Sequence, residues 1–148
     1  MAEVKHISNS LEDTKKIAID FSKCLKEGSV VAFFATLGAG KTTFINNLIN
    51  SFSKEDIVVT SPTFVYLNIY NLHLPIYHFD LYRIRNERNF EAMGFNEYFT
   101  LNGITLIEWA ENIQNILPEN TIFININHID ENKREIIIDQ KKEMLLNC

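Results

Sequence analysis

The chain of 148 residues lacks the features that mark several specialised protein classes. It has only two cysteines, Cys24 and Cys148, without CxxC spacing, which excludes a disulfide-rich scaffold and favours reduced thiols in a cytoplasmic protein. No apolar run approaches the ~18–20 residues of a membrane span, and the N-terminus MAEVKHISNS does not resemble a signal peptide. With 14 basic and 19 acidic residues, the net charge of −5 argues against a protein that coats nucleic acid.

Apolar residues, in contrast, are numerous enough for a hydrophobic core. They make up 46% of the chain, and no internal repeat, low-complexity tract or linker interrupts them. We therefore expect a single domain over residues 1–148, in which the tail 140–148 has no strong pattern and frays.

Helical and strand patterns alternate along this domain. Ser10 and Asp13 have the spacing of a helix cap, and the apolar run at Val30–Phe34 is typical of a strand buried on both faces. The alternation predicts an α/β three-layer sandwich with a mostly parallel central sheet and an antiparallel edge hairpin. Strands are also expected at Ile57–Val59, Phe64–Tyr70, Ile76–Phe79 and Ile104–Ile107, helices at Phe44–Phe52, Glu87–Met93 and Trp109–Leu117, and the hairpin at Thr121–Asn127 and Glu135–Asp139.

The segment ATLGAGKT, residues 35–42, lies directly between a predicted buried strand and a predicted helix. Glycines let backbone N–H groups approach a phosphate, and the positive end of the helix dipole faces the same anion. Lys41 would reach the β- and γ-phosphates, and the Thr42 hydroxyl would complete a Mg²⁺ shell. Ala35 replaces the first glycine of the GxxxxGK[ST] pattern, a change of one methyl group. The segment predicts a nucleotide-binding loop and the fold of a P-loop NTPase.

Two carboxylates, Asp80 and Glu108, follow predicted strands, where side chains project into the crevice at the carboxyl edge of the sheet. Either could hold Mg²⁺, and Glu108 could instead polarise the attacking water. Acidic strand ends are also common on ordinary surfaces, so both interpretations stay open. His78, inside an apolar strand, is expected to be a hydrogen-bonded core histidine and not a metal ligand.

Five motifs occur in order at close spacing, and together they resemble the TsaE (YjeE) family. This family consists of small bacterial ATPases needed for the threonylcarbamoyl modification of adenosine 37 in tRNA. The resemblance runs from the helix at Ser10 to Trp109, and more loosely to Arg134. The motifs are LGAGKTTF (37–44), SPTF (61–64), HFDLYR (78–83), MGF followed by Glu97 and Tyr98, and IEW (107–109).

The resemblance implies a set of site residues for ATP or ADP with Mg²⁺. Thr42 and Glu108 would coordinate Mg²⁺, and SPTF would be a switch loop beside the γ-phosphate. Leu11 would lie by the adenine. Lys41, Asp80 and Glu108 are the candidate catalytic residues, and the candidate nucleotide-binding residues are Leu11, Leu37, Gly38, Ala39, Gly40, Lys41, Thr42, Thr43, Glu111 and Arg134.

The resemblance also implies partners. The ATPase would bind the subunits TsaB and TsaD and reset that pair between turnovers. It would meet tRNA only through the complex, and no membrane is involved.

Departures from the family pattern leave two alternatives open. The family usually has Gly-Asp at Ala35-Thr36 and often Pro at Ala110, and the lost Asp charge favours a nucleotide-gated binding module with negligible turnover. A small-molecule kinase would need a basic lid, for which only Arg83–Arg88 is available. A GTPase is disfavoured, because no NKxD-type guanine-reading segment follows the last core strand.

Overall fold

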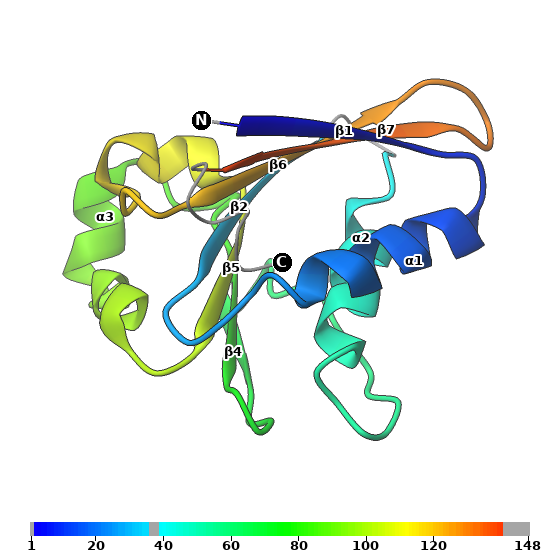
Figure 1. Ribbon diagram of the computed structural model, residues 1–148. Coiled ribbons are helices and arrows are strands. Elements are labelled where there is room, and N and C mark those ends of the chain that lie inside the picture. Colours follow the sequence, from blue (N-terminus) through cyan, green and yellow to red (C-terminus); the bar gives the residue numbers. More distant parts are fainter. Residues whose placement is uncertain (1, 36–38, 141–148) are drawn as a thin grey trace.

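The computed structural model describes residues 2–35 and 39–140. Over these ranges the chain forms one seven-stranded sheet in the order β1-β7-β6-β2-β5-β4-β3 (Figure 1). The central strands β6, β2, β5 and β4 are parallel, and the remaining pairings are antiparallel. The strands are β1 (Ala2–Ser8), β2 (Val30–Ala35), β3 (Leu67–Tyr70), β4 (Ile76–Asp80), β5 (Ile104–Glu108), β6 (Ile122–His128) and β7 (Arg134–Gln140).

Helices cover both faces of the sheet, which confirms the predicted mixed α/β arrangement with a mostly parallel centre. Helices α1 and α2 lie on one face, and α3 with the short 3₁₀ helices η1 and η2 lies on the other (Figure 1). Their bounds are α1 (Leu11–Ser22), α2 (Lys41–Asn50), α3 (Glu87–Ala92), η1 (Phe95–Thr100) and η2 (Ala110–Ile116). Within the described ranges, no helix is long and apolar enough to cross a membrane.

The predicted cap at Ser10 is confirmed and fixes the start of α1. The Ser10 hydroxyl accepts a hydrogen bond from the backbone N–H of Asp13 at 3.1 Å, and the Asp13 carboxylate accepts one from the N–H of Asn9 at 2.9 Å. These reciprocal bonds satisfy backbone donors that a helix N-terminus otherwise leaves without partners.

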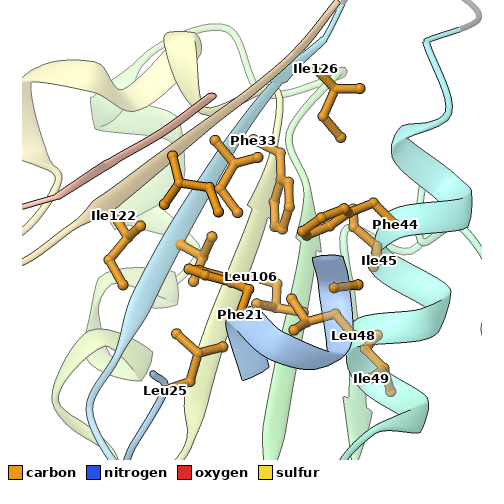
Figure 2. Packing of buried hydrophobic residues seen from close by; sticks show 14 of the residues in the cluster. Phe21, Leu25, Phe33, Phe44, Ile45, Leu48, Ile49, Leu106, Ile122 and Ile126 are labelled. Carbon is orange, nitrogen blue, oxygen red and sulfur yellow. The ribbon is translucent and has the colours of Figure 1, made fainter. Parts of the chain in front are cut away.

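A core of aromatic and aliphatic side chains joins α1 and α2 to the sheet. The Phe44 ring of α2 lies 6.0 Å from that of Phe33 in β2 and 6.3 Å from that of Phe21 in α1 (Figure 2). Ile76 of β4 and Leu106 of β5 belong to the same core. Because side chains alternate along a strand, His78 and Asp80 of β4 and Glu108 of β5 also face α2.

The segment between α2 and β3 differs from the prediction. Residues 57–59 do not form a strand. The Asn50 side chain binds the backbone of Ile57 in place of a neighbouring strand, accepting from its N–H and donating to its carbonyl. The N–H of Thr60, just after the segment, donates to the Tyr70 hydroxyl. The strand expected from Phe64 begins only at Leu67, since Tyr66 has φ 67° and its N–H closes a turn onto the Pro62 carbonyl.

The edges of the sheet also differ from the prediction. The final hairpin forms, but β1, which was not predicted, pairs with β7 and makes the edge. The helix expected at Trp109–Leu117 is a 3₁₀ helix from Ala110, because Trp109 is left-handed at φ 61° and Ile113 is non-helical.

Two predictions concern the C-terminal tail and the cysteines. Gln140 is buried in β7 and is not frayed, whereas residues 141–148 lie outside the described ranges.

Cys24 is disulfide-bonded, so the expectation of reduced thiols is wrong for this residue, and Cys148 lies outside the described ranges.

Candidate functional site

The carboxyl ends of β2, β5 and β4 meet the N-terminus of α2 at one edge of the sheet. Parallel pairing places Asp80 opposite Glu108 at the ends of β4 and β5, and Phe33 of β2 opposite Glu108. Both acids are nearly fully buried, and both project from the face that α2 covers. The prediction that these strand ends converge is therefore confirmed.

Glu108 lies between two nitrogen groups. Its Oε1 is 3.4 Å from Lys41 Nζ, and its Oε2 is 2.6 Å from His78 Nε2. Burial would raise the pKa of Glu108, but the hydrogen bond from His78 and the electrostatic interactions with His78 and Lys41 outweigh it and lower that pKa below its ordinary value. The carboxylate at this position is therefore ionised.

Asp80 has a different set of partners. Its Oδ2 accepts hydrogen bonds from the Thr63 hydroxyl at 2.8 Å and the Ser61 hydroxyl at 3.4 Å, and its Oδ1 accepts one from the N–H of Tyr82 at 2.9 Å. Ser61 and Thr63 belong to the SPTF segment, so this acid anchors that loop. Arg83 lies over the exposed Phe64 ring of the same segment, with 4.6 Å between the guanidinium carbon and the ring centroid.

The start of α2 is arranged differently from that of α1. Gly40 precedes the helix with φ 89°, a conformation that favours glycine, and provides no side-chain cap. Arg134 Nε donates a hydrogen bond to the Ala39 carbonyl at 3.0 Å and so braces this end of the loop. Leu37 and Gly38, both predicted to bind phosphate, lie outside the described ranges.

Five of the predicted nucleotide-binding residues lie together beside the start of α2. A cleft of about 120 Å³ is lined by Leu11, Gly40, Thr43 and Arg134, together with Ala39. Leu11 is 76% exposed although it is apolar, and it forms one wall of the cleft. The structure thus brings residues from the start of α1, the start of α2 and the start of β7 to one place.

Glu111 lies apart from that group. It lines a second cleft of about 360 Å³ with Lys41, Trp109, Asn125 and Asn127. A larger cleft of about 520 Å³ lies between α1 and the strands β1 and β7, and no predicted site residue lines it.

Two residues at the site, His78 and Trp109, were not among the predicted site residues. His78 is a buried, hydrogen-bonded histidine as expected, but its partner is Glu108. The Lys41 ammonium lies 5.2 Å from the centroid of the Trp109 ring, which also contacts Tyr82. The position of Trp109, directly after Glu108 in the sequence, was the signal that could have found it.

The oxygen atoms near Lys41 fit a hard divalent cation. Thr42 and Glu108 line the same small cavity, of about 10 Å³, together with Ser61 and His78. Residues 2–35 and 39–140 contain no group of three or more His, Cys, Asp or Glu side chains that could hold a metal ion by themselves. This donor set suits Mg²⁺, which usually keeps one or two protein ligands and takes the rest from waters and phosphates.

The fold and the site define an α/β protein whose parallel strands present buried acids to an uncapped helix N-terminus that carries a lysine. Comparisons with known proteins identify the family within this class to which the chain belongs. The sequence profile of the family described as threonylcarbamoyl adenosine biosynthesis protein TsaE matches residues 8–136. The chain therefore belongs to the TsaE family, which assigns it to tRNA threonylcarbamoyladenosine biosynthesis.

Relatives match over nearly the whole chain. It is 40% identical to the tRNA threonylcarbamoyladenosine biosynthesis protein TsaE of Rickettsia conorii, over 93% of this chain and 79% of that protein. It is 37% identical to the protein of the same name from Bacillus subtilis, over 98% and 92%. The crystal structure of YdiB from Bacillus subtilis superposes with a TM-score of 0.81 at 31% identity, covering 99% of this chain and 92% of that one.

Proposed function

We propose that this chain has the P-loop NTPase fold, binds ATP with Mg²⁺ and hydrolyses it to ADP, in support of tRNA threonylcarbamoyladenosine formation. The observation that carries the proposal is the ion pair between Lys41 and Glu108 at the start of α2. A lysine that reaches phosphates and an acid that holds a metal or its water are the groups that phosphoryl transfer requires at one place. The family's role in tRNA modification supports it and suggests a cytoplasmic protein.

Each part of the nucleotide has a candidate set of contacts. The N-terminus of α2 has no side-chain cap, and its dipole favours an anion, so the phosphates would lie there with Lys41. Thr42 and Glu108 would hold Mg²⁺, which would neutralise charge on the phosphates when bound. The base would enter the cleft of Leu11, Thr43 and Arg134.

The proposed partners are the TsaB and TsaD subunits, which the chain would bind and reset. The hydrogen bond from Thr63 to Asp80 supports a switching role, because it links the SPTF segment to the acid that pairs with Glu108 across the sheet. A loop that changes partners when nucleotide binds is a common way to control a protein interface. The same bond favours the second candidate, a nucleotide-gated binding module in which ATP moves the loop and turnover is negligible.

The test measures ATP binding by calorimetry and phosphate release, with Mg²⁺, for the chain alone and with purified TsaB and TsaD. We expect binding alone, slow release alone, and faster release with the partners. Lys41→Ala should lose both activities. No ATP binding by the folded protein would overturn the proposal, and binding without any release would favour the gated module. Transfer of phosphate to a small acceptor would instead identify a kinase.

A further inference from the structure

The one buried histidine of the site, His78, forms a short contact that the proposed function does not use. His78 is 2% exposed and stands in the middle of β4, where it pairs with Leu106 across the sheet. Glu108 pairs with Asp80, two residues farther along. His78 and Glu108 are thus diagonal neighbours on one face, and a long side chain is needed to span that diagonal.

The two carboxylate oxygens of Glu108 have different partners. His78 Nε2 lies 2.6 Å from Oε2, while Oε1 lies 3.4 Å from Lys41 Nζ. Because an ionised carboxylate can only accept, the hydrogen of this contact lies on Nε2, while Nδ1 is buried without a hydrogen-bond partner among the described residues. Nε2 carries that hydrogen whether the ring is neutral or charged.

We propose that His78 is a positioning residue: its Nε2–H holds Oε2 of Glu108 so that Oε1 stays directed at Lys41 and the nucleotide site. Without this donor, Oε2 would be a buried acceptor with no partner, which is costly. The carboxylate would then turn to satisfy both oxygens with Lys41, the nearest cation. Lys41 would be drawn away from the phosphates, and no oxygen of Glu108 would remain available to Mg²⁺.

Two substitutions separate the hydrogen bond from the packing of the ring. In His78→Gln the side-chain amide nitrogen lies three bonds beyond Cβ, as Nε2 of histidine does, and keeps a donor toward Glu108. In His78→Asn the amide nitrogen lies one bond closer to the backbone, where Nδ1 was, and the donor is lost. Both variants are uncharged and polar, so they form a matched pair.

The effect on turnover rests on the proposed function. Loss of a residue that orients a metal ligand typically costs about 10–100-fold in activity or metal affinity. We expect that loss in kcat/KM for His78→Asn, with a raised KM for ATP because Lys41 is drawn away from the phosphates. His78→Gln should retain most of the activity. Equal losses in both variants would show that only the ring's packing matters, and no loss in either would remove His78 from the mechanism. If His78→Asn does not fold, His78→Met takes its place, because methionine is as long as glutamine and has no hydrogen to donate.

A second readout needs neither ATP nor turnover. Trp109 is the chain's single tryptophan, and its ring lies 5.2 Å from Lys41 Nζ, so its emission reports on the position of that ammonium. We expect changed emission intensity for His78→Asn, unchanged emission for His78→Gln, and no further change when His78→Asn is added to Glu108→Gln. Should the wild type hydrolyse no ATP, the proposed function would fail while this comparison still tests the positioning role. Identical emission in all folded variants would contradict it.

Discussion

The two acids at the ends of β4 and β5 look alike in the sequence but lie in different surroundings. Glu108 contacts nitrogen groups that carry or can carry charge, namely Lys41 and His78. Asp80, its neighbour across the sheet, accepts hydrogen bonds from the hydroxyls of Ser61 and Thr63 and from a backbone N–H. The carboxylate of Glu108 is thus paired with the lysine at the start of α2, and that of Asp80 is hydrogen-bonded to the SPTF loop.

This difference suggests that Glu108 and Asp80 have different functions. An ionised carboxylate held beside a lysine is suited to bind a cation and to act on the phosphate. A carboxylate whose partners are loop hydroxyls can release the loop when nucleotide and metal offer those hydroxyls new partners. We therefore expect the chemistry to depend mainly on Glu108 and the loop's response mainly on Asp80.

The largest expected effect comes from removing the charge of Glu108. Glu108→Gln keeps the size of the side chain but loses the ion pair with Lys41, and turnover should fall by roughly 10²–10³-fold, as for the loss of one transition-state contact. ATP affinity measured by calorimetry should change much less. A fall in affinity as large as the fall in turnover would show that Glu108 contributes to binding alone.

The matched substitution Asp80→Asn should have a smaller effect. Asparagine can still accept from the N–H of Tyr82, and the Thr63 hydroxyl can donate or accept, so the loop contacts can be kept. We expect turnover to fall by about tenfold, the lower end of what a supporting residue contributes. Steady-state rates of both variants with TsaB and TsaD decide the matter, and a larger loss for Asp80→Asn would reverse the proposed division.

The comparison also shows what the sequence could predict. The acids at the strand ends, the buried run of β2 and the Ser10 cap follow from local patterns, and each is found in the structure. The contact between His78 and Glu108 could not be foreseen, because it joins residues 30 positions apart and depends on the register of β4 with β5. A one-residue shift of that register would place the two side chains on opposite faces.

Failures of prediction occur where tertiary contacts override local propensity. The sequence of β1 has no strong alternation, and it becomes a strand because β7, from the far end of the chain, offers it an edge. Residues 57–59 are apolar enough for a strand. The Asn50 side chain instead binds the backbone N–H of Ile57, and the Tyr70 hydroxyl binds that of the following residue, Thr60. In the site, Trp109 was missed because its left-handed backbone and its place beside Lys41 belong to the folded chain.

A smaller effect is expected when the loop is detached from Asp80. Thr63→Val removes a 2.8 Å hydrogen bond. It should reduce the protection of the Val65 and Tyr66 amides, which donate to the Pro62 carbonyl of the SPTF segment, by about 1–3 kcal/mol in native-state hydrogen exchange. Ser61→Ala is the matched control, because its bond to the same oxygen is 3.4 Å long and weaker. Equal effects of the two variants would mean that Thr63 does not anchor the loop more than Ser61 does.

The smallest effect is expected in the acid dependence of stability. Because the pKa of Glu108 is lowered below the ordinary 4.5, the charged form contributes stability that is fully present above that value and is lost as the pH falls through the folded-state pKa. The free energy of unfolding of the wild type relative to Glu108→Gln should therefore be constant above about pH 5 and decrease below it. Urea titrations of both proteins at several pH values measure this difference. A stability difference that instead grows as the pH falls would mean that burial, and not the contacts with His78 and Lys41, controls this carboxylate.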